Sequence, residues 1–142
     1  MSVDYDKISY PKIEEKVKFI LDDYFTNIYI SPVFKMFGNE CVQINLESSA
    51  SEELATNFEV RSYDLKINYY TKADMTDENQ NQFVKNRIDK LKKVLIDNQV
   101  NGNNWAKLEV VDITYNADID EGGHEDVFLA ELDITITNYN QF

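Results

Sequence analysis

The segment VFLAELDITITNY (residues 127–139) alternates between apolar and polar side chains along most of its length. Phe128, Ala130, Leu132, Ile134 and Ile136 fall on one side of this pattern. Such alternation is typical of a strand that buries one face and keeps the other polar. A fold that contains this strand must therefore cover one face of a sheet and leave the opposite face polar.

A second long strand is predicted within FEVRSYDLKINYYTK (residues 58–72). Its apolar positions, Tyr63, Leu65, Ile67 and Tyr69, alternate with Asp64, Lys66, Asn68 and Tyr70. The small polar segment SSASEELATN (residues 48–57) comes directly before it and is expected to be a connecting loop.

Three shorter strands complete the predicted sheet. The first contains Ile28 and Ile30 and should end at Pro32. The second follows a turn at Gly38-Asn39, with Val42, Ile44 and Leu46 on one face. The third lies in WAKLEVVDITYNA (residues 105–117), with Val111, Ile113 and Tyr115 on one face and Leu108 and Val110 on the other.

Two amphipathic helices are predicted from apolar residues that recur three and four positions apart. The first spans residues 11–25, and its apolar positions are Ile13, Val17, Ile20 and Tyr24. The second is capped by Thr76 and stopped by Asn101-Gly102. Its stripe is Val84, Ile88, Leu91 and Leu95, flanked by Phe83 and Val94.

This order of elements predicts an α+β fold: one mainly antiparallel sheet with two helices packed on one face. Residues 1–10 show no apolar period, so we expect a flexible N-terminal arm followed by a single domain at residues 11–142.

The formal net charge of −12 argues against binding nucleic acid through its phosphates, because the Coulomb interaction has the wrong sign. The single cysteine, Cys41, cannot form an internal disulfide and is expected to be a buried thiol. The first residues lack the pattern of a signal peptide, and no apolar run is long enough to span a bilayer. We expect synthesis in the cytoplasm.

The stretch DIDEGGHED (residues 118–126) is the one place where Asp, Glu and His crowd together. It fails as an EF-hand loop, because Gly122 holds the fifth position and Leu129 the twelfth. His124 is the only histidine, so a transition-metal site would lack a second nitrogen ligand. We expect this stretch to be a hairpin tip exposed to solvent. Weak binding of divalent cations is the alternative.

Catalytic signatures such as GxSxG, the P-loop and the dinucleotide fingerprint do not occur in the sequence. We therefore expect a protein that is not an enzyme and that uses no cofactor and no metal. An enzyme with an acidic metal site at residues 118–126 stays a further hypothesis.

Nine tyrosines and eight phenylalanines suggest an aromatic interaction surface. Tyr70 alternates with polar residues, and Trp105 follows two asparagines. Both are expected to be exposed for subunit packing, and the alternative is that they pack against the helices or the sheet edges.

The N-terminal helix, the short strands, the long strand in SEELATNFEVRSYDLKINYY, the second helix and the final strand VFLAELDITITNYNQF together show a resemblance. From about residue 11 to residue 142, the chain resembles the tail terminator proteins of long-tailed bacteriophages, of the minor tail protein U type, and related head–tail completion proteins. The resemblance implies a structural virion protein of the phage neck. It would form a hexameric ring that caps the tail tube and lets DNA pass.

The implied partners are further copies of the chain, the major tail tube protein and the head–tail connector protein, with no membrane and no specific DNA binding. The expected contact residues are Glu52 and Glu53 in the acidic loop; Arg61, Tyr63, Lys66 and Tyr70 on the long strand; Trp105; and Asp118, Asp120, Glu121, His124 and Asp126 at the tip. The alternative function is an acidic adaptor or chaperone domain that binds a basic protein.

Overall fold

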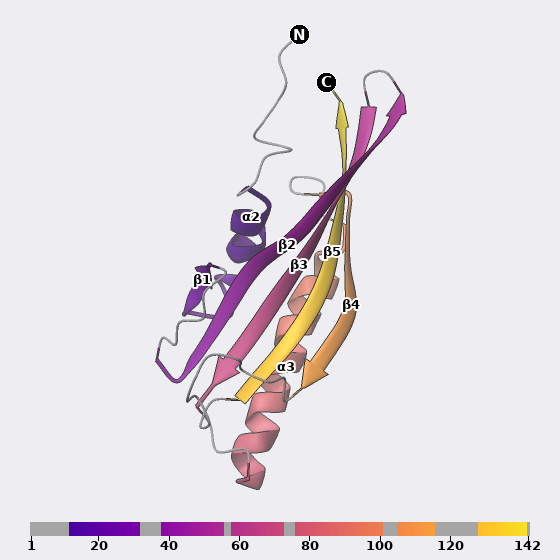
Figure 1. Ribbon diagram of the computed structural model, residues 1–142. Helices are drawn as coiled ribbons and strands as arrows, with labels where there is room; N and C mark the ends of the chain where they lie inside the picture. Colours follow the sequence, from indigo (N-terminus) through magenta and orange to yellow (C-terminus); the bar gives the residue numbers. More distant parts are fainter. Residues whose placement is uncertain are drawn as a thin grey trace.

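A computed structural model describes residues 12–31, 38–55, 58–72, 76–100, 105–115 and 128–141 (Figure 1). The elements are α2 (Lys12–Leu21), β1 (Ile28–Ile30), β2 (Glu40–Ala55), β3 (Phe58–Thr71), α3 (Glu78–Asp97), β4 (Lys107–Tyr115) and β5 (Phe128–Gln141). Five strands form one sheet in the order β1-β2-β3-β5-β4. The predicted α+β class is confirmed.

The sheet is mixed, with one parallel pair at its edge. β1 runs parallel to β2, whereas the β2–β3, β3–β5 and β4–β5 pairs are antiparallel. β5 lies between β3 and β4, although it follows both in the chain. β3 and β4 consequently run parallel to each other on either side of β5, and α3 connects them.

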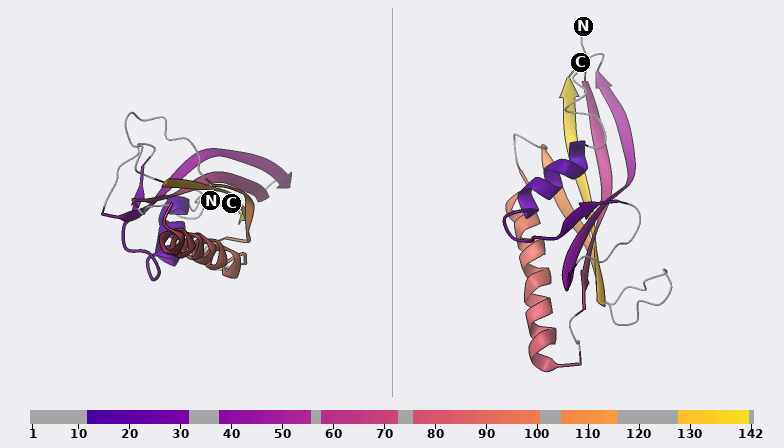
Figure 2. Two further views of the ribbon diagram at one scale, coloured as in Figure 1. Left: turned by 90° about the horizontal axis from the view of Figure 1, so that it is seen from below. Right: turned by 90° about the vertical axis from the view of Figure 1, so that its left-hand side faces the viewer.

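The hydrophobic core lies between the sheet and the two helices, which Figure 2 shows on the same side of the sheet. The predicted stripe of α3 is buried, and the alternating apolar residues of β3 and β5 face it. The largest fully buried aliphatic side chains are Leu21, Ile44, Leu65, Ile67, Ile88, Leu91, Leu95, Leu108 and Leu132. Each contributes about 1.5–3 kcal/mol through burial, so this one-sided core holds the layers together.

The helix ends differ from the predicted ones by a few residues. α3 is capped by Asp77 and not by Thr76: Asp77 Oδ1 accepts hydrogen bonds from the backbone N–H groups of Asn79 (2.9 Å) and Gln80 (3.2 Å). A carboxylate also interacts favourably with the helix dipole, which a hydroxyl does not. α2 ends at Leu21 in a turn that leaves Tyr24 exposed and buries Phe25.

The segment predicted to be a loop at residues 48–57 is largely strand. β2 continues to Ala55, and the backbones of Glu52 and Glu53 pair with Val60 and Glu59 of β3. Serine and alanine have weak intrinsic strand preference, but pairing with β3 decides the conformation here. The prediction of an acidic loop at Glu52-Glu53 is therefore wrong.

β4 departs from simple alternation through a β-bulge between Val110 and Asp112. The extra residue places Ile113 against the core together with Leu108 and Val110, while Val111 is 63% exposed. A bulge reverses the facing of the residues that follow it. The predicted shared face for Val111 and Ile113 is therefore wrong.

Part of the sheet extends beyond the helices. β2, β3 and β5 continue upward in Figure 1 as a three-stranded ribbon, which we define by residues 48–55, 58–62 and 137–141. The right-hand view in Figure 2 shows this ribbon extending beyond α2 and α3. The core includes Tyr63 and Ile136 but none of the described side chains of the ribbon. Among the side chains that the structure describes, the ribbon thus adds none to the core.

Candidate functional site

The face of the sheet opposite the helices is rich in carboxylates. Because β3 and β5 bury alternate residues, Asp64, Glu131 and Asp133 point away from the core. We define the acidic sheet face as Glu47, Asp64, Glu109, Asp112, Glu131 and Asp133, together with Lys66 and Lys107. These six carboxylates and two amines give the face a negative balance.

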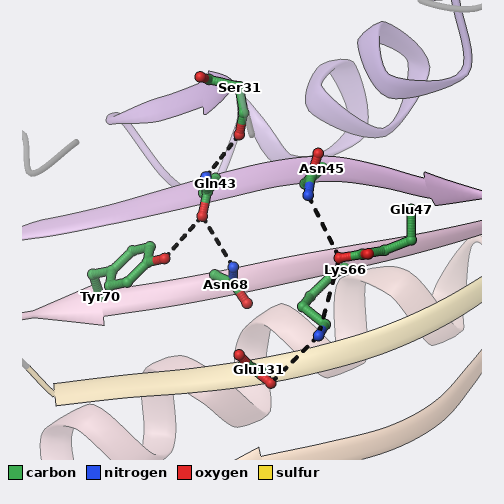
Figure 3. A network of polar contacts seen from close by, with 8 residues as sticks. All are labelled: Ser31, Gln43, Asn45, Glu47, Lys66, Asn68, Tyr70 and Glu131. Carbon is green, nitrogen blue, oxygen red and sulfur yellow. Dashed lines mark hydrogen bonds and ion pairs between the residues drawn. The ribbon is translucent and has the colours of Figure 1, made fainter. Parts of the chain in front are cut away.

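Lys66 is the cation at the centre of this face. Its Nζ lies 3.7 Å from an oxygen of Glu131 and 4.0 Å from one of Glu47 (Figure 3). Asp133 lies opposite Lys66 in register, and Asp112 of β4 lies opposite Asp133. Partly exposed ion pairs contribute at most about 1 kcal/mol. The charges therefore shape the surface more than they stabilise the fold.

Asp64 is held by two hydroxyl groups. Ser48 Oγ donates to Oδ2 at 3.1 Å, and Thr135 Oγ1 donates to Oδ1 at 3.0 Å. These bonds come from the two strands that flank β3, so they fix the carboxylate in an exposed position. The acidic sheet face consequently extends across β2, β3, β5 and β4, and Asp64 is held in place within it.

Next to this array, a buried polar network centres on Gln43. Its Nε2 donates to Ser31 O at 2.7 Å, and its Oε1 accepts from Asn68 Nδ2 at 3.0 Å and from Tyr70 Oη at 2.8 Å (Figure 3). Burial raises the pKa of the Tyr70 hydroxyl. Cys41 is buried on the same strand, as predicted. At this end of the outer face, the polar side chains are therefore buried in contacts within the fold.

The aromatic residues expected at an exposed interface lie inside the subunit. Tyr63, Tyr70 and Trp105 are only 2%, 4% and 2% exposed. The expected exposure of Tyr70 and Trp105 is wrong, and the alternative, packing within the fold, is correct. Trp105 donates its indole N–H to Asn98 O at 2.7 Å, and burial raises the pKa of Tyr63. Alternation with polar residues indicates on which face of a strand a side chain lies, but it does not show whether that side chain is exposed.

The other expected contact residues are distributed over several places. Arg61 lies on the ribbon, 3.5 Å from Glu59, and Lys66 lies at the centre of the acidic sheet face. The backbones of Glu52 and Glu53 belong to the ribbon. Asp118, Asp120, Glu121, His124 and Asp126 lie outside the described residues. The hypothesis about the 118–126 tip therefore stays a prediction.

A second polar cluster joins α3 to β2. The Arg87 guanidinium contacts both carboxylate oxygens of Glu40, at 3.1 and 2.8 Å, and donates to Tyr24 O at 2.9 Å. It also lies 4.3 Å from the centre of the Phe25 ring. Tyr69 hydrogen-bonds Glu40, and this carboxylate raises the pKa of Arg87. The cluster connects α3, β2 and the turn after α2, so its role is structural.

The helices carry the opposite charge to the rest of the chain. α2 and α3 contain eight basic and five acidic residues, a formal +3, whereas the other residues contain six basic and 21 acidic ones, a formal −15. Lys85, Lys92 and Lys93 are exposed on α3, and so are Glu78, Asp89 and Asp97. Lys93 Nζ lies 3.2 Å from Asp97 Oδ2. The exposed surface of α3 therefore carries charges of both signs.

The described residues form a surface pocket but no cluster of metal-ligating side chains. Among these residues, no group of three or more His, Cys, Asp or Glu side chains is placed to hold a metal ion. A surface pocket at the start of α3 is lined by Asn39, Glu40, Thr71, Lys72, Asn79, Gln80 and Phe83. Its lining combines amide, hydroxyl and charged groups with the phenyl ring of Phe83. None of the described helices is both long and apolar enough to cross a membrane.

Comparison with protein-family models and with curated proteins found no match. The geometry and charge of the chain itself are therefore the basis for proposing its function.

Proposed function

We propose that this chain is a structural virion protein of the tail terminator or head–tail joining type, which assembles into a ring and has no catalytic activity. The observation that carries the proposal is the three-stranded ribbon, which extends past the core. Strands that extend beyond the core of their own subunit are stabilised when a neighbouring subunit covers them. Repeated contact between copies is the simplest source of such a neighbour.

The edge of β2 supports assembly in a second way. β1 pairs only with Val42–Ile44, so among the described residues the rest of β2 forms the edge of the sheet. Open edges can pair with or dock against another chain. In a ring, each subunit would cover the ribbon and the open part of the β2 edge of the next.

The charge of the protein is compatible with a ring through which DNA passes. A formal net charge of −12 disfavours contact with phosphates. The proposed partners are the major tail tube protein below the ring and the head–tail connector protein above it. The mature location is the virion neck, after synthesis in the host cytoplasm.

Oligomeric state tests this proposal directly. Native mass spectrometry and light scattering should show one closed oligomer, expected to be a hexamer, at about 0.15 M salt, where the Debye length is about 8 Å. Electron microscopy of the same sample should show rings with a central opening. A strict monomer at millimolar concentration and high salt would contradict the proposal.

The acidic sheet face favours a second candidate function, an adaptor or chaperone domain that binds a basic protein. This candidate predicts a monomer or dimer whose affinity for a basic partner falls steeply with ionic strength. A ring that forms without any partner would exclude it as the main role.

A further inference from the structure

The three-stranded ribbon has two outer edges, formed by β2 on one side of β3 and by β5 on the other (Figure 1). On the β2 side, the pairing with β1 ends at Ile44, before the ribbon begins. On the β5 side, β4 pairs only as far as Thr137. Among the described residues, both edges therefore lack a neighbouring strand over the same part of the sheet.

The hydrogen bonds of the sheet show which backbone groups point out of the β5 edge. Ala106 N–H donates to Thr137 O at 3.1 Å, so the carbonyl of Thr137 points away from β3. The N–H and C=O of a strand residue point to the same side, and this side alternates along the strand. The β3–β5 register is continuous as far as Gln141. The backbone groups of Tyr139 and Gln141 therefore point out of the subunit.

The β2 edge can be assigned in the same way. Val42 N–H donates to Asn27 O at 2.8 Å, on the side of β1. The register shift between Leu46 and Ser48 then exchanges the two sides of β2. The backbone groups of Ser51 and Glu53 consequently point out of the ribbon.

We infer that the β5 edge of one copy pairs in parallel with the β2 edge of the next copy, so that neighbouring ribbons form one continuous sheet. This inference rests on the proposed function, because it names the strands that join neighbouring subunits of the ring. β2 and β5 run in the same direction, since each is antiparallel to β3. Copies related by rotation about an axis along the strands would therefore present these two edges to each other in parallel.

The positions of the outward backbone groups fit such a pair. Tyr139 and Glu52 lie at the same level of the ribbon, because both pair in register with Val60. In a parallel pair, a residue bonds to the two residues that flank its partner. With Tyr139 opposite Glu52 of the next copy, Tyr139 N–H can donate to Ser51 O, and Tyr139 O can accept from Glu53 N–H. All of these groups already point outward, so the pair requires no rearrangement of the ribbon.

The composition of the two edges also permits pairing. Edge strands that avoid contact with other chains often carry lysine or proline. Residues 45–55 of β2 and residues 138–141 of β5 contain neither. Residues 138–141 carry no charge, so the glutamates of β2 meet no like charge on the strand that would pair with them.

A second copy is the occupant that the geometry favours. A single strand from another protein could pair with one edge only, and the other edge would stay open. A further copy of the chain supplies the complementary edge for each, at the same level and in the same direction. Such a head-to-tail contact closes into a ring when the rotation between copies allows, and a closed sheet has no open edge.

Two substitutions at Tyr139 test the backbone pair. Tyr139→Pro removes an N–H that points out of the subunit, so the ribbon keeps its own hydrogen bonds, and edge strands tolerate proline. Tyr139→Ala is the matched control, because it also removes the phenol ring but keeps the N–H. In native mass spectrometry over a concentration series, the proline variant should need at least about tenfold higher concentration than the alanine variant to assemble. Circular dichroism should show the same fold for both variants.

A pair of cysteines tests the register. Within one subunit, Glu52→Cys and Tyr139→Cys lie on strands separated by β3. At about 4.8 Å between strands, their Cα atoms are about 10 Å apart, whereas a disulfide needs about 4.4–6.8 Å. Mild oxidation should therefore join different copies, and denaturing electrophoresis should show a ladder of covalent multimers that a reducing agent removes. Val111→Cys with Tyr139→Cys is the control: Val111 is 63% exposed on β4, outside the ribbon, and this pair should give no ladder.

The two measurements separate the inference from the proposed function. Assembly of Tyr139→Pro at the same concentration as Tyr139→Ala, or rings of the Glu52→Cys, Tyr139→Cys variant that give no ladder, would overturn the edge pairing and leave the ring itself intact. If the proline variant is unfolded, the cysteine pair decides alone. A wild-type protein that stays monomeric would instead contradict the proposed function.

Discussion

Arg87 joins α3 to β2 and to the turn after α2, so its replacement by glutamine should weaken three parts of the fold together. The substitution removes the charge that contacts both oxygens of Glu40 and the N–H that donates to Tyr24 O. It also removes the cation above the Phe25 ring. Glu40 would keep its hydrogen bond with Tyr69 but lose its counter-ion.

The magnitude follows from the exposure of the pair. A hydrogen bond to a charged group contributes about 1.5–3 kcal/mol when it is well formed. Both side chains are 26% exposed, so water screens part of this interaction. With about 0.5–1 kcal/mol for the lost cation–π contact, the free energy of unfolding should fall by about 2–3 kcal/mol.

Urea unfolding followed by tryptophan fluorescence measures this change, because Trp105 is the only tryptophan and is buried. Wild type and variant must be compared at one protein concentration, since the proposed assembly would also stabilise the folded state. Lys93→Gln is the control: the Lys93–Asp97 pair is 66% and 58% exposed, and its loss should change stability by less than about 0.5 kcal/mol. Equal effects of the two substitutions would refute the reasoning.

Three further predictions concern the fold. The pKa values of Tyr63, Tyr69 and Tyr70 are raised above 10.0, chiefly by burial. The stability that these hydroxyls contribute is full below pH 10 and falls above it, by up to about 1.4 kcal/mol per pH unit for each tyrosine. Urea unfolding at several alkaline pH values should show a shallower decline for Tyr70→Phe, and an unchanged slope would contradict this. Asp77→Ala should lower the free energy of unfolding in urea by about 1 kcal/mol, and an unchanged value would argue against Asp77 as the cap. In a thermal melt, Ile113→Ser should destabilise the fold far more than Val111→Ser, and equal melting temperatures would argue against the bulge.

The sequence predicted best those elements whose pattern is local. The stripe of α3 and the apolar alternation of β3 and β5 can be read from consecutive residues, and all three elements are present. It failed at residues 48–55, where serines and alanines form a strand only because β3 pairs with them. It failed again at Val111, since a bulge depends on the register between two strands and leaves no clear local pattern.

The candidate site was predictable only in part. Asp64, Glu131 and Asp133 already stood out as the polar members of alternating strands. Their proximity to Asp112 depends on the strand order, which places β5 between β3 and β4. Tyr70 was correctly assigned to the face away from the core, but its contact with Gln43 joins residues 27 positions apart. Such contacts cannot be read from one strand.

The central position of β5 has a consequence for synthesis. The ribosome makes β3, α3 and β4 before β5, yet neither β3 nor β4 has its neighbour on that side until β5 has emerged. Domains fold as units while the chain is made, so this sheet closes only near the end of translation. A nascent chain that stops before residue 128 would leave β3 and β4 separated by a gap and would lack Glu131 and Asp133. Incomplete chains would thus be unable to present the acidic sheet face.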